Sequence, residues 1–313
     1  MATHQGPDGD ALGSALALAF GLKKIGKKVR IYNQDPVPSY LRFLPGSEQV
    51  SRILNEKERF DASFIVDCAD LHRVGNIFQE HSGLGIKIVV DHHARSGKAG
   101  DLNFIDAHAA SSGMVVVEVL KALRVALDRK IATNIYATIV ADTGNFRYAN
   151  VNAKVFETAK RMVEAGAVPW RISREIYERH PKERFRLLPR VIETLKLFFD
   201  DRVAMIAVTQ DMLRQTGATR DMTEDFIEYP RSIGSVEVSV FLQEAEDGRV
   251  RVSLRSKESI DVSRIAAGFG GGGHARAAGC IIEAGMERVQ DRLIKAIQAE
   301  LEQNLVYSQK SLC

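Results

Sequence analysis

The chain has 313 residues, of which 45% are hydrophobic and 27% charged, with a formal net charge of +3; this length predicts two domains with separate cores. No run approaches the ~20 apolar residues that span a bilayer, which argues against a membrane protein. The basic residues are spread along the chain, so the charge suits small anionic ligands better than long duplex nucleic acid, which needs an extended basic stripe.

The N-terminus and the cysteines predict where the protein works. Met1 to His4 contain neither the basic nor the apolar region of a secretory signal. Cys68, Cys280 and Cys313 are odd in number and far apart. This pattern indicates reduced thiols rather than a disulfide framework or a zinc knuckle. We therefore expect a cytoplasmic protein.

The first half alternates short apolar runs with helical patterns. Strands are expected at 28–32, 62–66 and 86–90, and helices at 11–25, 112–123, 153–165 and 170–179. The run 135–141 is ambiguous, because its beginning reads as helical and its end could be extended. Strands that read as continuous apolar runs between helices predict a mostly parallel sheet flanked by helices.

The second half predicts a smaller α/β domain with a mixed sheet. Strands are expected at 203–208, 236–243, 250–254 and 280–283, and helices at 261–269, where Asp261 is the N-cap, and 286–301. The stretch 181–199 reads as helical, with an interruption at Pro189. We expect a first domain at 1–185, a linker at 186–196 and a second domain at 197–313, with a cleft between the domains.

Acidic and imidazole side chains stand at or just beyond the ends of expected strands. They occupy four stretches: His4 to Asp10, Asp67, Asp91 to His93, and Asp142. Ligands of open α/β sheets bind at the carboxyl edge of the strands. If these carboxylates converge at about 5 Å, each pair repels by about 3 kcal/mol at an effective dielectric near 20, and bound cations would remove that cost. Imidazole and carboxylate ligands without thiolate favour Mn²⁺ or Mg²⁺ over structural zinc.

The first stretch is compact because Gly6, Pro7 and Gly9 force a tight loop. In such a loop Asp8 and Asp10 could face different ions while His4 folds back on the first, and two such ions could share a bridging carboxylate. The alternative is an ordinary Pro-Asp-Gly turn whose carboxylates are solvated. For Cys68, which follows Asp67, core packing is favoured over ligation because successive strand residues face opposite sides.

The run Asp91-His92-His93 predicts three different roles. Two adjacent imidazoles cannot easily bind one ion from an extended segment, so one can be the ligand and the other can contact the phosphate of a substrate. Asp91 can then orient an imidazole as a hydrogen-bond acceptor. For Asp142, which precedes a Thr-Gly-Asn turn, the alternative is a helix cap or a turn cap.

These motifs, in this order, resemble the DHH phosphoesterase superfamily. The resemblance covers nearly the whole chain and is found at His4 to Gly13, Asp67-Cys68, Asp91-His92-His93 and Ala141 to Gly144. The second half is similar to the DHH-associated C-terminal domain. Its matching residues are Arg255-Ser256-Lys257, Asp261 to Ser263, and Gly270 to Gly279. The two-domain oligoribonuclease and pAp phosphatase branch is the most similar.

The resemblance implies two Mn²⁺ ions, for which Mg²⁺ is the substitute. One ion would be held by His4, Asp8 and Asp67, and the other by Asp10, Asp67, His92 and Asp142. His93 would face the substrate and Asp91 would orient it, so that these two are the catalytic residues. The terminal phosphate or base would be bound by Arg255, Gly271, Gly272, Gly273 and His274. The expected reaction is hydrolysis of short oligoribonucleotides to 5′ mononucleotides, or of pAp to AMP.

One departure and several rival functions stay open. The family has an apolar first strand before its first histidine, whereas only three residues precede His4 here. Either the start has been clipped or most of a central strand is missing. Hydrolysis of cyclic or linear di-adenylate is the nearest rival, and a non-catalytic nucleotide sensor is a rival of another class. The sequence also leaves open whether the chain forms a homodimer.

Overall fold

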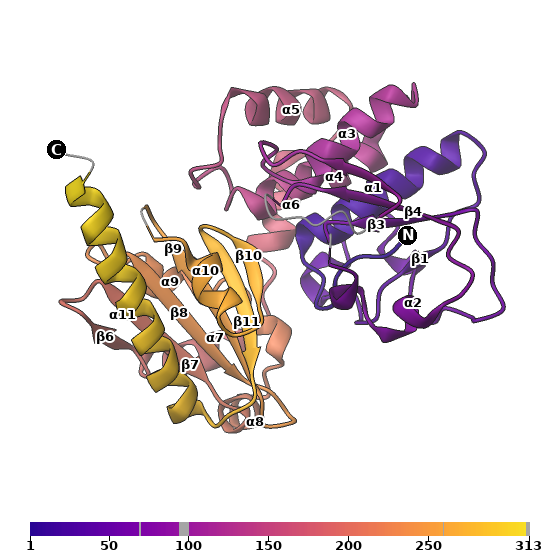
Figure 1. The fold of residues 1–313 in the computed structure, drawn as a ribbon. Helices are drawn as coiled ribbons and strands as arrows, with labels where there is room; N and C mark the ends of the chain where they lie inside the picture. The colour runs from indigo at the N-terminus through magenta and orange to yellow at the C-terminus, as the bar shows by residue number, and fades with distance from the viewer. Residues whose placement is uncertain (69, 94–99, 259, 311–313) are drawn as a thin grey trace. The chain divides into compact units, whose positions relative to one another are not determined.

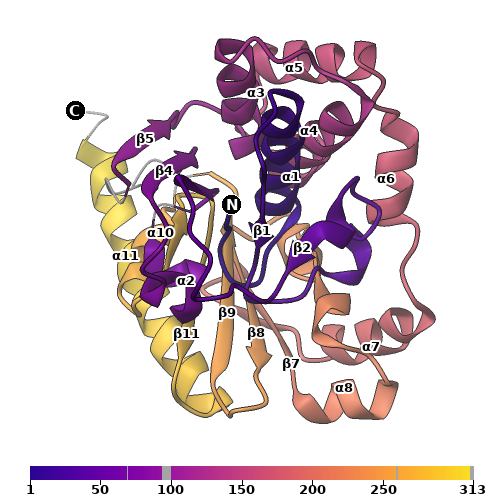
Figure 2. The ribbon, with the colours of Figure 1, turned by 90° about the vertical axis from the view of Figure 1, so that its right-hand side faces the viewer.

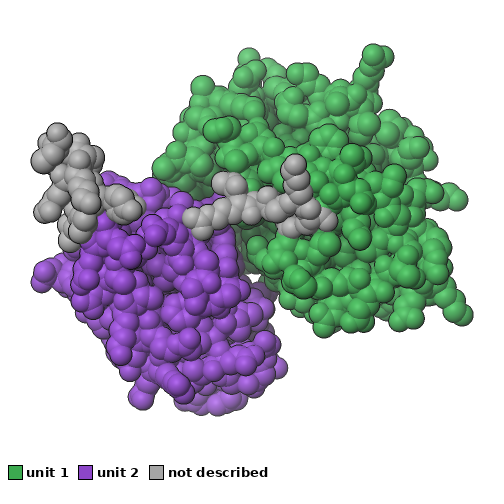
Figure 3. Space-filling model, viewed as in Figure 1, with its two compact units in different colours: residues 1–179 green, residues 180–313 purple. Residues whose placement is uncertain are grey.

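The computed structural model describes residues 1–68, 70–93, 100–258 and 260–310, and the chain divides into two compact units, residues 1–179 and 180–313 (Figure 3). This division precedes the linker expected at 186–196. Most of that segment belongs to helix α7 (Lys182–Ile192). Leu187 and Val191 of α7 are four residues apart, as on one face of a helix, and both are buried in the core of unit 2. None of the described helices is both long and apolar enough to cross a membrane.

Unit 1 contains a parallel sheet. Its strands are β1 (Ile31–Tyr32), β2 (Val50–Ser51), β3 (Ala62–Val66), β4 (Ile86–Asp91) and β5 (Leu102–Ile105). β1 pairs with β2, and the remaining strands pair in the order β3-β4-β5. The strand expected at 28–32 is thus confined to its last two residues, because residues 28–30 lie at the surface.

The first residues of the chain join these two sets of strands. Ala2 forms parallel bridges to both Tyr32 and Ile65. Its N–H donates to the carbonyl of Phe64 at 2.8 Å, and its carbonyl accepts from Val66 at 2.9 Å. A single residue therefore takes the central position where the family resemblance implies a whole strand. His4 follows just beyond the carboxyl edge of the sheet.

Helices cover both faces of this sheet, as the sequence predicted (Figure 2). They are α1 (Gly9–Lys24), α2 (Asn76–Glu80), α3 (Ser112–Ala122), α4 (Arg129–Asp142), α5 (Ala153–Glu164) and α6 (Pro169–Tyr177). Short 3₁₀ helices occur at Ser39–Leu41, Ser47–Gln49 and Leu71–Val74. Val66 and Val90 pack in the core with α1, α3 and α4. Ile65 and Val89 point the other way and pack with Phe78 of α2.

The ambiguous run 135–141 is helical throughout, so the extended end considered for it is wrong. It belongs to α4, whose N-cap Asp128 accepts hydrogen bonds from the N–H groups of Lys130 and Ile131. The run is apolar because α4 is buried among other helices, which removes the polar face that would mark it as helical. Asp142 therefore stands at the end of a helix and not of a strand.

Unit 2 is built on a mixed six-stranded sheet. Its order is β10-β11-β9-β8-β7-β6, with β7 and β8 parallel and the other neighbours antiparallel. The strands are β6 (Lys196–Phe198), β7 (Val203–Val208), β8 (Val238–Glu244), β9 (Val250–Ser256), β10 (Gly272–His274) and β11 (Ala277–Ile282). This arrangement confirms the mixed α/β fold predicted for the second half.

Two sets of helices cover the sheet of unit 2. One face carries α10 (Val262–Ala267) and α11 (Met286–Lys310), and Figure 1 shows α11 lying across the strands. The other face carries α7, α8 (Gln210–Thr216) and α9 (Glu228–Arg231), with a 3₁₀ helix at Arg220–Thr223. Met205 and Ile206 are neighbours on β7. Met205 packs in the core under α10 and α11, and Ile206 packs in the core under α7, α8 and α9. Cys68 and Cys280 are buried and free, whereas Cys313 lies outside the described residues.

Candidate metal centre

Six predicted metal ligands lie together in unit 1. One group, with ligand atoms within 4.8 Å of one another, consists of His4, Asp8 and Asp67. A second group, meeting the same distance limit, consists of Asp10, His92 and Asp142. The side chains come from the loop before α1, the first turn of α1, the ends of β3 and β4, and the end of α4. Residues far apart in the sequence thus meet at the carboxyl edge of the sheet.

Asp67 connects the two groups. Its Oδ2 lies 3.5 Å from Nε2 of His4, and its Oδ1 lies 3.6 Å from Nε2 of His92. Its φ of 57° falls in the left-handed region, which non-glycine residues rarely occupy and which costs of order 1–3 kcal/mol. The fold holds this residue in an unfavourable conformation while turning one carboxylate oxygen toward each group. One carboxylate is thus placed where it could contact both groups.

Asp10 is fully buried and is held by the start of α3. Its carboxylate accepts hydrogen bonds from the N–H groups of Ser112 at 2.7 Å and Gly113 at 3.1 Å, and from the hydroxyl of Ser14 at 3.0 Å. The positive end of the helix dipole stabilises this negative charge. A Cβ on Gly113 would come within 2.0 Å of Thr138 Oγ1, so only glycine fits there.

Sequence reasoning missed Ser14, Ser112 and Gly113. Ser112 also donates its hydroxyl to Oδ1 of Asp67 at 2.9 Å, so it supports both groups of ligands. The signal was the Ser-Ser-Gly run at the start of the helix expected at 112–123, because small polar residues there present N–H groups to an anion.

The carboxylates and imidazoles shift one another's pKa values. Although burial lowers the pKa of His92, its hydrogen bond to Asp142 and the nearby carboxylate charges raise it to about 11. Burial likewise lowers the pKa of His4, but Asp67 and Asp8 raise it to about 9. Burial raises the pKa of Asp10 well above its usual value, and the charges of Asp67 and Asp142 add to that rise. Deprotonation of these groups would leave four carboxylate charges close together, and bound divalent cations would compensate for them.

The donor set fits divalent cations. It contains four carboxylates and two imidazoles, and His4 and His92 each turn Nε2 toward carboxylates while Nδ1 donates to a backbone carbonyl. Such backbone contacts orient imidazole ligands in metal sites. Burial raises the pKa of Cys68 to about 12, which keeps its thiol protonated. Oxygen and imidazole donors without thiolate favour hard or borderline ions.

Cation binding at this centre should release protons at neutral pH. The raised pKa values keep His4 and His92 protonated in the metal-free protein, and a ligating nitrogen must lose its proton. Affinity for Mn²⁺ is therefore expected to rise as the pH increases from about 6 to about 9, because fewer protons then compete with the ion for the imidazole nitrogens. Calorimetric titrations in buffers of low and high protonation enthalpy measure the release. Equal heats in both buffers would contradict it.

Asp91 holds the ring of His93. Its Oδ1 accepts a hydrogen bond from Nδ1 of His93 at 2.7 Å and from the backbone N–H of His92 at 2.8 Å, and Asp91 is fully buried. The Nε2 atom of His93 consequently points away from Asp91. The ring is in edge contact with His92, 5.0 Å between centroids. The two adjacent imidazoles are thus oriented by different partners.

The residues predicted to bind substrate lie on or beside β9 and β10, toward one side of the sheet of unit 2. Arg255 of β9 and His274 of β10 both pair with Ala277 of β11, so the side chains of Arg255 and His274 lie on the same face, with a methyl group between them. That face is opposite α10 and α11, because Leu254 packs with those helices. The groups could therefore contact one ligand together.

The glycine run lies partly in a strand. Gly272 and Gly273 belong to β10, where they pair with Gly279 and Ala278. A Cβ on Gly271 would lie 2.2 Å from the carbonyl of Gly279, and Gly273 has a φ of 139°. The run is glycine-rich because its backbone lies very close to β11. Gly272 has open space around its α-carbon.

Comparison with known proteins connects both units to one family. The DHH family N-terminal domain matches residues 1–141 and the DHHA1 domain matches residues 200–303. The bifunctional oligoribonuclease and PAP phosphatase NrnA of Thermus thermophilus is 33% identical over 96% of this chain and 89% of its own length. The cyclic-di-AMP phosphodiesterase PdeA of Listeria monocytogenes is 25% identical over 95% of this chain but 46% of its own length.

A solved structure is similar over the same extent. The exopolyphosphatase-related protein of Bacteroides fragilis is 26% identical and superposes with a TM-score of 0.82, covering 96% of this chain and 90% of that one. Three observations indicate the same family: the order of the sequence motifs, the sheet of each unit and the sequence identity with NrnA. The chain therefore belongs to the DHH family and carries a DHHA1 domain in its second half.

Proposed function

We propose that this chain is a two-metal-ion phosphoesterase that hydrolyses short oligoribonucleotides to 5′ mononucleotides, removes the 3′ phosphate of pAp, or does both. The observation that carries the proposal is Asp67, whose two carboxylate oxygens lie near His4 on one side and His92 on the other. The similarity to NrnA, named as a bifunctional oligoribonuclease and PAP phosphatase, supports the choice of substrates.

The proposed ligand sets follow the two groups of side chains. His4, Asp8 and Asp67 would hold one ion, and Asp10, Asp67, His92 and Asp142 the other, with Mn²⁺ as the expected metal and Mg²⁺ as the substitute. When bound, such ions activate water at neutral pH and neutralise charge on the phosphoryl oxygens. The N–H groups at the start of α3 fix Asp10 and leave its carboxylate little freedom to move.

His93 is the proposed contact to the reacting phosphate, with Asp91 as the residue that positions it. The hydrogen bond to Asp91 fixes the ring of His93 and, although burial lowers the pKa of His93, raises it above its usual value. An imidazolium near a phosphate can donate a hydrogen bond to a phosphoryl oxygen, and a charged donor forms a stronger bond than a neutral one.

Asp91→Asn should lower kcat about 10- to 100-fold, because a partner that orients a functional histidine has effects of that size. The side chain keeps its shape, so the fold should be retained. Loss of the charge should also move the pH profile of kcat to lower pH, since Asp91 raises the pKa of His93. Steady-state rates over a pH series measure both effects. The control is Glu118→Gln, an exposed charge loss on α3; a profile that did not move would assign Asp91 a purely structural role.

Arg255 and His274 are the proposed anchors for the far end of the substrate. A guanidinium binds a terminal phosphate through two parallel N–H donors. Arg255→Gln should therefore raise KM for pAp about tenfold while kcat stays unchanged. Arg251→Gln is the matched control, because Arg251 lies four residues earlier on β9 and on the same face of the sheet. Equal KM values for the two variants would remove Arg255 from the substrate site.

A substrate panel tests the proposed function. The protein is incubated with labelled di- to pentaribonucleotides, pAp and cyclic di-adenylate, each with Mn²⁺ and with Mg²⁺. Release of 5′ mononucleotides or AMP supports the proposal, whereas turnover of the cyclic substrate alone would favour the PdeA-like activity. No product from a folded, metal-loaded protein would exclude catalysis. Retained nucleotide binding by that inactive protein would instead indicate a sensor.

A further inference from the structure

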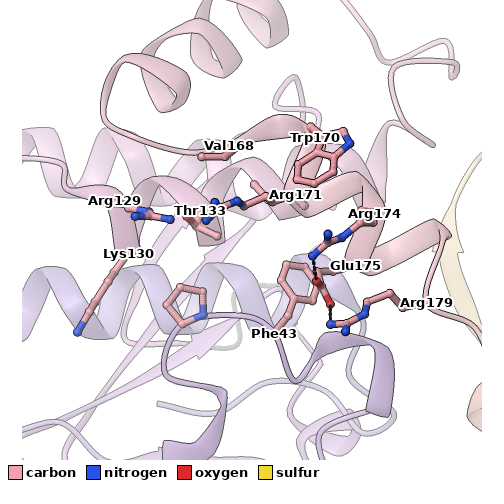
Figure 4. Close-up of a pocket in the computed structure, with 12 residues that line it drawn as sticks. Phe43, Arg129, Lys130, Thr133, Val168, Trp170, Arg171, Arg174, Glu175 and Arg179 are labelled. Atoms are coloured by element: carbon pink, nitrogen blue, oxygen red, sulfur yellow. Dashed lines mark hydrogen bonds and ion pairs between the residues drawn. The ribbon is translucent and has the colours of Figure 1, made fainter.

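Unit 1 contains a cavity of about 740 Å³ that none of the predicted metal ligands lines (Figure 4). It lies between helix α6, the start of α4 and the segment that carries Phe43 and Pro45. Five of its lining residues are basic, namely Arg129, Lys130, Arg171, Arg174 and Arg179, and one, Glu175, is acidic. Its size falls within the range of pockets that bind small molecules.

Three of these basic residues, Arg129, Lys130 and Arg171, have no acidic partner among the described residues. The carboxylate of Glu175 pairs with Arg174 at 3.1 Å and with Arg179 at 2.7 Å. Across the described ranges, no carboxylate lies within 4.0 Å of the guanidinium groups of Arg129 or Arg171. Figure 4 shows the side chain of Arg171 reaching from α6 toward Arg129 and Thr133 on α4. Two like charges that face one cavity repel each other, and a bound anion would remove that repulsion.

The start of α6 adds to the positive potential of the cavity. Its N-cap is Val168, whose side chain has no oxygen and makes no capping hydrogen bond. The first N–H groups of the helix therefore receive no acceptor from the N-cap side chain, and the positive end of the helix dipole is not neutralised there. Val168, Trp170 and Arg171 all line the cavity, so this helix end lies at its wall.

An exposed aromatic ring stands beside these cations. The side chain of Trp170 is 61% exposed. The guanidinium carbon of Arg174 lies 4.7 Å from the centroid of the Trp170 ring and occupies one of its faces. A nucleobase could stack on the other face, because planar bases stack on indole rings with little dependence on base identity. An indole together with unpaired guanidinium groups is suited to a ligand that has both a base and a phosphate.

The adjoining surface is less suited to bind a ligand. A neighbouring depression shares Arg129 and Lys130 with the cavity and is otherwise lined by Phe20, Lys23, Lys24 and Asp128. Its lysines already have partners. Lys24 pairs with Asp128 at 2.8 Å, and the ammonium groups of Lys23 and Lys130 lie 5.9 and 5.3 Å from the Phe20 ring. Arg129 and Arg171, whose guanidinium groups have no acidic partner among the described residues, thus both line one cavity of nucleotide size.

We propose that this cavity binds a nucleotide unit, with its base stacked on Trp170 and its phosphates on Arg129 and Arg171. The site is separate from the metal centre, since Arg129 begins α4 and Asp142 ends it. Fourteen helical residues place these ends roughly 20 Å apart. The ligand is either a free nucleoside diphosphate or one nucleotide of a single strand, and the cavity size favours the free nucleotide. Binding requires no metal and is independent of the proposed hydrolysis.

Fluorescence of Trp170 provides a direct test, because it is the single tryptophan of the chain. The full-length protein is titrated with ADP in excess EDTA. Excitation is at a wavelength longer than the adenine absorption band. We expect saturable quenching at ADP concentrations below about 1 mM. Adenosine and inorganic pyrophosphate, which each lack one half of the ligand, should bind at least about tenfold more weakly. Tighter binding of tetra-adenylate than of ADP would identify a strand as the source.

Charge-removing variants locate the binding. The double variant Arg129→Gln, Arg171→Gln should raise the Kd for ADP at least about tenfold. Lys160→Gln, an exposed charge loss on α5, should leave it unchanged. Thermal unfolding confirms that each variant is folded. The proposal is overturned by an absence of saturable quenching, by pyrophosphate binding as tightly as ADP, or by a double variant that binds ADP like the unaltered protein.

Discussion

Asp67→Asn is expected to lower kcat for a dinucleotide about a thousandfold, which corresponds to about 4 kcal/mol of transition-state stabilisation. Asparagine has the same shape and tolerates the left-handed backbone conformation of this residue better than most side chains. It can also accept the hydroxyl hydrogen bond that Ser112 donates to Oδ1. What is lost is the negative charge that two ions would share, so the effect falls on the metal centre and not on the fold.

The same variant should retain fewer bound ions. Metal content of the purified protein, measured by elemental analysis after loading with Mn²⁺, is expected to fall below that of the unaltered chain. Asp61→Asn is the control, since Asp61 is an exposed carboxylate just before the same strand. A variant that kept full metal content and more than about a tenth of the activity would show that Asp67 does not bridge.

Gly13→Val should destabilise the protein by about 3 kcal/mol, because it would force apart two closely packed helices. A Cβ at Gly13 of α1 would lie 2.6 Å from Thr138 Cγ2 and 2.8 Å from the carbonyl oxygen of Asn134, both on α4. The carbonyl belongs to the backbone, so no side-chain rotation removes the clash. Urea unfolding measures the free energy, and Glu157→Val on α5 controls for the helix propensity of valine.

Activity should fall in this variant more than its loss of stability explains. Helix α4 ends at Asp142, so a displacement of α4 moves a predicted metal ligand away from His92, which now lies 3.1 Å from it. Rates are therefore measured at urea concentrations well below the unfolding transition, where the variant is folded. A Gly13→Val protein as stable as the control would mean that α1 and α4 are less closely packed than these distances indicate.

Much of the centre could be predicted because parallel strands impose a simple geometry. β3 and β4 are short apolar runs, and the residues just after such strands meet at one edge of the sheet. That rule brings Asp67 and His92 together from sequence alone. It gave the wrong element for Asp142, because a buried helix and a buried strand both read as apolar runs when no polar face marks the period.

Other features depend on contacts between residues far apart in the sequence, for which a local pattern names no partner. The N–H of Ser112 reaches Asp10 across 102 residues of sequence, and every residue except proline has an N–H group. The linker expected at 186–196 rested on a local signal, because Pro189 suggested an interruption of the helix. In the structure Pro189 is on the exposed side of α7, while Leu187 and Val191 anchor the helix in the core. Tertiary packing, rather than local propensity, decided both cases.

The strand orders also decide where the protein is open to self-association. In unit 2 the sheet ends in β6 and β10, which have three residues each and offer little backbone for pairing with another chain. In unit 1, β5 ends the order β3-β4-β5, and the apolar side chains of Leu102 and Phe104 on it are exposed. Within that unit, the edge at β5 is where a strand from a second molecule would add most readily, so aggregation would begin in the unit that holds the metal centre.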